Sequence, residues 1–164
     1  MCKYTTNLKI LRIWSRMSAV VSFWSISVTD PSFCPLPCCW LQWDVNSSVC
    51  VRTIENAHSL NISAIDTNHD SLSVFSGSRD YTVKEWDAET GKCKSNFSTP
   101  RNIVTSLKFD QNSQSLLFQG SEDLCVRVWD TRNSSKQPSV HITAFVYFPV
   151  CLSLHPHGGY LATG

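Results

Sequence analysis

The sequence carries little charge and no excess of either sign. Charged residues make up 16% of its 164 residues, and 14 Lys and Arg nearly balance 13 Asp and Glu, which gives a formal net charge of +1 at pH 7. Proteins that bind a polyanion through surface charge carry a basic patch or stripe, often with stacking aromatic residues. The sequence has neither feature, so we expect no nucleic-acid partner.

The chain also lacks an apolar run long enough to cross a bilayer. Its apolar N-terminal stretch, residues 19–28, is interrupted by Ser22, Ser25 and Ser27, whereas a spanning helix needs about 20 apolar residues. Four basic residues precede this stretch, as in a targeting segment, but no small-residue cleavage site follows it. We therefore expect no membrane partner and a cytoplasmic location.

The eight cysteines do not show the paired spacing of common zinc fingers. Cys50 and Cys93 are 43 residues apart and are interpreted as small apolar strand residues. We therefore expect reduced thiols and no cofactor. Cys34, Cys38 and Cys39 form a cluster for which two alternatives remain. It could bind zinc, with Cys50 or His58 as the fourth ligand, or it could contain a reactive thiol.

A tryptophan followed by an aspartate recurs at a fixed interval. These dipeptides begin at Trp43, Trp86 and Trp129, so that neighbouring copies are 43 residues apart. Residues 75–87 and 118–130 are the same segment twice, with a glycine nine residues and an aspartate six residues before each tryptophan. A repeat of about 40–45 residues indicates a structural unit that stacks on copies of itself.

This pattern resembles the WD-repeat (WD40) family over residues 38–164. The resemblance implies an all-β fold, an incomplete WD-type β-propeller of antiparallel four-stranded blades with about two full blades plus two partial ones. In the best copy we expect strands over residues 62–67, 72–77, 82–86 and 92–97. The implied units are a blade end (38–55), two blades (56–98 and 99–142) and a half blade (143–164), while residues 1–37 stay unassigned or form a degenerate blade.

An open propeller leaves apolar blade faces and strand edges without neighbours, because each blade is stabilised by the blades on both sides. We therefore expect a truncated form. A short splice form, an incomplete gene model and one segment of a longer protein all remain open as its origin.

Blades of this family commonly bury a hydrogen-bonded tetrad, and the resemblance assigns it here to His58, Ser76, Asp80 and Trp86. We interpret these residues as structural and not as a catalytic triad, because buried polar groups inside a sheet satisfy one another. The next copy is expected to have an incomplete network, since it keeps the aspartate and tryptophan but has Gln119 in place of the serine. The partial set is Asp123, Trp129 and, in the last copy, Thr163.

The resemblance also implies a function. It favours a non-catalytic scaffold that binds other proteins, and a second candidate partner is further blades from a longer chain or another subunit. The contacts are expected just before the tetrad aspartate and in the loops that lead into the blades, at Arg79, Glu122, Arg101 and Asn102. The alternative function is a zinc- or thiol-dependent activity at the cysteine cluster.

Overall fold

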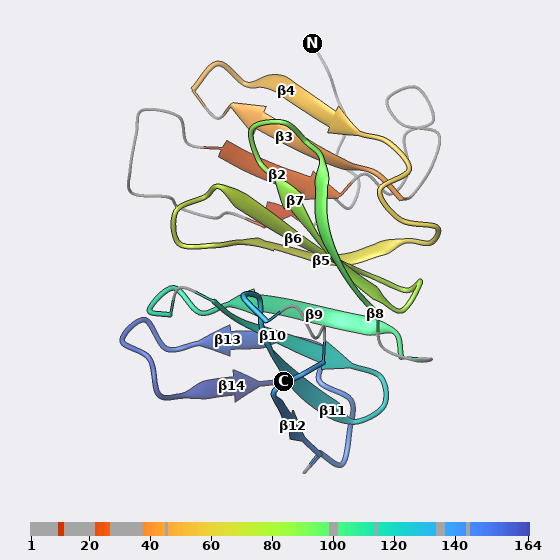
Figure 1. Cartoon of the computed structure of the whole chain (residues 1–164), viewed down its shortest axis with the longest axis vertical. Coiled ribbons are helices and arrows are strands. Elements are labelled where there is room, and N and C mark those ends of the chain that lie inside the picture. The colour runs from red at the N-terminus through yellow and green to blue at the C-terminus, as the bar shows by residue number, and fades with distance from the viewer. Residues whose placement is uncertain are drawn as a thin grey trace.

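The computed structural model describes residues 10–11, 22–26, 38–44, 46–98, 102–113, 115–133, 137–143 and 145–164. Over these ranges the chain forms strands and no helix, as the resemblance predicts, and it therefore offers no helix that could cross a membrane. The strands build three four-stranded antiparallel sheets and one two-stranded sheet. Figure 1 shows the three four-stranded sheets following one another along the long axis of the molecule, with the two-stranded sheet beside the third.

The first sheet contains two strands from the segment that the sequence left unassigned. Its order is β1 (Ile10–Leu11), β2 (Ser22–Ile26), β3 (Trp40–Asp44) and β4 (Val49–Ile54). Strand β2 pairs along all of β3, from Ser22 opposite Asp44 to Ile26 opposite Trp40. The structure thus extends the first sheet upstream of residue 38.

The remaining sheets follow the sequence repeat. The second contains β5 (Ile62–Thr67), β6 (Ser73–Ser78), β7 (Thr82–Asp87) and β8 (Cys93–Ser98), each within one residue of its predicted bounds. The third contains β9 (Val104–Phe109), β10 (Leu116–Ser121), β11 (Cys125–Asp130) and β12 (Val140–Ile142). The two-stranded sheet pairs β13 (Leu152–Leu154) with β14 (Leu161–Thr163).

The aspartate of each Trp-Asp pair closes the turn after the third strand. The carboxylate of Asp87 accepts the backbone N–H groups of Glu89 at 3.0 Å and Thr90 at 2.7 Å, and Asp44 and Asp130 likewise accept the N–H two residues ahead. This is the local bond by which aspartate favours turns. The bond from Thr90 lowers the pKa of Asp87 to about 2. The recurring aspartate is therefore explained by turn geometry.

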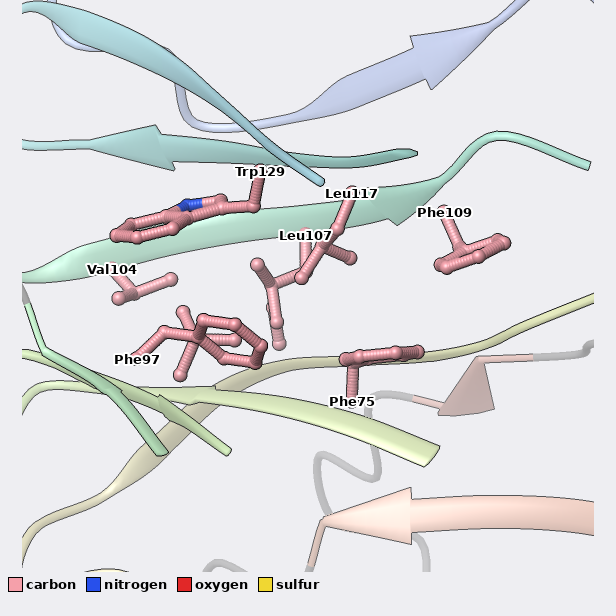
Figure 2. Packing of buried hydrophobic residues seen from close by; sticks show 9 residues of the cluster. Phe75, Phe97, Val104, Leu107, Phe109, Leu117 and Trp129 are labelled. Atoms are coloured by element: carbon pink, nitrogen blue, oxygen red, sulfur yellow. The ribbon is translucent and has the colours of Figure 1, made fainter. Parts of the chain in front are cut away.

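Two apolar cores lie between the sheets. Between the first and second sheets, the rings of Trp40 and Trp86 meet edge to face with centroids 6.1 Å apart. Between the second and third sheets, Phe75 stacks on Phe109 at 5.3 Å and Phe97 contacts Trp129 at 5.6 Å. Figure 2 shows these side chains filling the space between the two sheets. The second sheet is thus covered on both faces.

The innermost strands of neighbouring sheets lie side by side and run in the same direction. Near their starts, the Ser63 hydroxyl donates to the carbonyl of Val104, and the Thr105 hydroxyl donates to the carbonyl of Pro149. Near their ends, the Asp66 carboxylate accepts the N–H of Phe109 at 2.9 Å. The loops that lead into β5, β9 and β13 therefore lie at one end of the stack. We call them the leading loops, described over residues 55–61, 102–103 and 145–151.

Candidate functional site

The candidate site is the end of the stack that carries the leading loops. The β6–β7 hairpin (residues 79–81) joins this end because the N–H of Arg79 donates to the carbonyl of Asn61 at 3.0 Å. The β10–β11 hairpin (residues 122–124) does the same through the N–H of Glu122 and the carbonyl of Ile103 at 3.1 Å. The leading loops and these two hairpins together form what we call the loop face.

Four hydrogen-bonded side chains of the second sheet anchor the loop face. The Trp86 indole N–H donates to the Ser76 hydroxyl at 2.7 Å, and that oxygen lies 2.7 Å from His58 Nε2. His58 Nδ1 lies 3.0 Å from a carboxylate oxygen of Asp80. The structure thus brings together the four residues to which the resemblance assigned a tetrad. Their hydrogen bonds form a continuous series from the apolar core to the hairpin.

Asp80 is the point at which this chain reaches the loop face. Its carboxylate accepts the backbone N–H groups of Ser59 and Thr82, each at 3.0 Å, and the Thr82 hydroxyl at 2.6 Å. Burial works to raise the pKa of Asp80, but the hydrogen bonds from His58 and Thr82 outweigh it and hold that pKa well below its usual range. The ionised carboxylate therefore fastens the hairpin to the leading loop.

The third sheet anchors its hairpin by a different route. The Trp129 indole N–H donates to the Gln119 side-chain oxygen at 2.7 Å, and the Gln119 amide donates to the Ser121 hydroxyl at 3.0 Å. The Arg127 guanidinium donates to that hydroxyl at 3.0 Å and forms an ion pair with Asp123. The sequence predicted an incomplete network here. The tetrad is absent, but a substitute path again joins the buried indole to the hairpin carboxylate.

Sequence reasoning missed Gln119, Ser121 and Arg127 as members of this path. Gln119 and Arg127 are direct cross-strand partners on β10 and β11, so their side chains lie on one face of the sheet. A signal was present, because Arg127 follows Asp123 by four residues and Lys84 follows Asp80 by four. Lys84 instead donates to the carbonyl of Ala57 at 2.6 Å in its leading loop.

The structure places the other predicted residues as follows. Arg79 and Glu122 are exposed at equivalent places of the two hairpins, and Asn102 is half-buried in the leading loop of β9. These three residues share the loop face. Thr163 is exposed on β14. Arg101 lies outside the described residues.

The cysteine cluster differs from the predicted one. Cys39 is disulfide-bonded, so the expectation of reduced thiols is wrong at this position and its sulfur is not available as a thiolate ligand. Cys38 is buried with a free thiol, and both ring nitrogens of His58 already contact the tetrad. Cys34 lies outside the described residues. Across the ranges that the structure covers, no group of three or more His, Cys, Asp and Glu is arranged to hold a metal ion.

Stacked antiparallel four-stranded sheets with a Trp-Asp pair on the third strand define a protein of the blade-repeat class. The family described as WD domain, G-beta repeat (WD40) matches residues 48–87 and 91–130. These two matches identify residues 48–87 and 91–130 as WD repeats. The first match runs from just before β4 to the end of β7, and the second runs from just before β8 to the end of β11. Each sequence repeat therefore contains the outer strand of one sheet and the first three strands of the next. A search of curated proteins finds no match.

Proposed function

We propose that this protein is a non-catalytic scaffold that binds other proteins through the loop face. WD repeats generally support protein interaction, and the anchoring of the loop face carries the proposal. The tetrad of the second sheet and the different side-chain network of the third sheet end at the same hairpin position, at Asp80 and at Asp123. Both fix a hairpin whose neighbouring side chain points into solvent, which is how a rigid frame presents binding residues on loops.

The chemistry of the tetrad supports binding in preference to catalysis. Ser76 and His58 are buried, and their polar atoms contact one another and the neighbouring side chains. A nucleophile and its base must reach a substrate to react. We therefore assign the tetrad to holding the loop face and assign binding to its exposed residues. These are Arg79 and Glu122, with Asn102 and Arg101 beside them.

The experiment compares two pairs of charge deletions in the full chain. One variant combines Arg79→Ala with Glu122→Ala on the loop face. The control combines Glu89→Ala with Lys92→Ala, which removes one acid and one base from the exposed β7–β8 turn at the other end of the stack. Proteins retained by the tagged wild-type chain are identified by cross-linking and mass spectrometry.

We expect the loop-face variant to lose the specifically retained proteins and the control to keep them. Both variants should unfold at the same temperature as the wild type, because exposed charges contribute little to stability. Loss of the retained proteins in the control alone would contradict the proposal, as would their full retention by the loop-face variant.

A further inference from the structure

An aspartate lies buried beside aromatic rings between the second and third sheets. Asp66 is 2% exposed, near the end of β5, and its cross-strand neighbour on β6 is Phe75. Phe75 stacks on Phe109 of β9 at 5.3 Å, in the apolar core that Figure 2 shows. Phe109 is also the equivalent residue of the next repeat, 43 positions after Asp66. A carboxyl group therefore occupies a buried position at which the next copy has an apolar side chain.

Asp66 joins the second sheet to the third. Its carboxylate oxygen Oδ2 accepts the backbone N–H of Phe109 at 2.9 Å and lies 3.3 Å from the ammonium group of Lys108, the preceding residue of β9. These two contacts connect the innermost strands of both sheets near their ends. We call Asp66, Lys108 and Phe109 the carboxylate joint.

The surroundings of the joint favour a neutral carboxyl group over a carboxylate. Burial removes the water that would solvate the negative charge. From β6 the neighbour is the apolar Phe75, and Lys108 is the one charged side chain that faces Asp66 in the described part of the chain. The Lys108 side chain is 33% exposed, so solvent screens its attraction. Burial accordingly raises the pKa of Asp66, although Lys108 and the backbone N–H of Phe109 act to lower it.

We infer that the carboxylate joint is a pH-sensitive contact, which holds the second and third sheets together more firmly in mild acid than at neutral pH. When Asp66 takes up a proton, it loses the charge that burial disfavours and keeps an oxygen to accept the Phe109 N–H, while Lys108 turns to solvent. When the proton leaves, the buried charge returns and the two sheets separate more often.

The response of Asp80 is opposite, which distinguishes the joint from general unfolding by acid. The pKa of Asp66 is raised above its unfolded value, so the stabilisation is complete below about pH 4 and is lost as pH rises through the raised value. The pKa of Asp80 is held well below its usual range, so its anchoring is lost only as pH falls through that low value. Mild acid thus strengthens the joint and leaves Asp80 ionised. The inference is therefore independent of the proposed function.

Two NMR measurements on the full chain test the joint. The carbon-13 shift of the Asp66 carboxyl group gives the pH at which it titrates. Hydrogen exchange of the Phe109 amide, divided by the intrinsic exchange rate at each pH, gives the equilibrium constant for opening. We expect the Asp66 midpoint to lie above about pH 4. The opening constant should rise with pH across that midpoint, by about tenfold for each pH unit by which the pKa is raised.

Three variants assign the response to the joint. Asp66→Asn keeps an oxygen for the Phe109 N–H but does not titrate, so its opening constant should no longer depend on pH in this range. Lys108→Met removes the facing charge and should raise the Asp66 midpoint. The matched control is Asp70→Asn in the β5–β6 hairpin, whose carboxylate is exposed, and it should keep the wild-type profile.

Each outcome decides the inference. It is supported by a raised midpoint together with an opening constant that rises in the wild type and in Asp70→Asn but stays flat in Asp66→Asn. An Asp66 midpoint at or below about pH 4 overturns it, as does an opening constant that is flat in the wild type or rises equally in Asp66→Asn. A lower midpoint in Lys108→Met also overturns it. If Asp66→Asn does not fold, the wild-type midpoint and opening constant decide by themselves.

Discussion

Ser76→Ala is the sharpest test of how the loop face is held. The Ser76 side chain is fully buried, and its hydroxyl contacts Trp86 and His58 at 2.7 Å each. Alanine fits the same backbone and removes only that oxygen. The substitution therefore leaves a buried indole N–H and a buried imidazole nitrogen without their partner, and it introduces no steric conflict.

The expected loss follows from these two groups. A buried polar group that loses its partner costs about 1–3 kcal/mol, so the free energy of unfolding should fall by about 2–6 kcal/mol. Single domains are commonly stable by about 5–15 kcal/mol. The expected loss is therefore a large fraction of the stability of an ordinary domain.

Urea unfolding of the full chain, followed by tryptophan fluorescence and by circular dichroism, measures this loss. The control is Ser153→Ala on β13, whose hydroxyl is exposed and whose removal should change stability by less than about 0.5 kcal/mol. A double-mutant cycle with Trp86→Phe isolates the indole–hydroxyl pair. The reasoning fails if Ser76→Ala is as stable as Ser153→Ala, or if the cycle shows no coupling energy.

Three further substitutions test the contacts between and within the sheets. Gly77→Ala should lower the urea midpoint, at a cost of about 1–3 kcal/mol, because its Cβ would lie 2.5 Å from Cγ1 of Val104 on the next sheet. Burial raises the pKa of Asp66, so stability should fall as pH rises above about 4 towards that raised value, and Asp66→Asn should flatten this slope in urea titrations at several pH values. Arg127→Met leaves the Asp123 carboxylate without its ion pair and should lower the unfolding temperature at a cost of about 1–3 kcal/mol.

The repeat made the second sheet predictable. Asp80 and Asp87 mark the turns after its second and third strands through bonds to nearby backbone N–H groups, and such local chemistry can be read from the sequence. The four strands consequently lie within one residue of their predicted bounds. Strand β2 has no such marker, because Pro37 stands where the other copies have an aspartate six residues before the tryptophan. The place of β2 is set by its pairing with β3.

The candidate site was predictable to a similar degree. The tetrad positions came from the family resemblance, and the structure brings these residues into contact. The path through Gln119 and Arg127 was not predicted, because it depends on cross-strand register and replaces an imidazole with a guanidinium. The positive φ of Tyr81, 69°, was also missed, although a positive φ in a hairpin usually falls on glycine or asparagine.

The anchoring of the hairpins explains why that strain is tolerated. Residue 81 lies between two fixed points, because the Asp80 N–H donates to the Ser78 hydroxyl at 3.1 Å and the Thr82 N–H donates to the Asp80 carboxylate at 3.0 Å. A residue held on both sides keeps an unfavourable φ that a free loop would release. The tetrad therefore does more than satisfy buried polar atoms. It also holds Tyr81 in a backbone conformation that glycine would otherwise occupy.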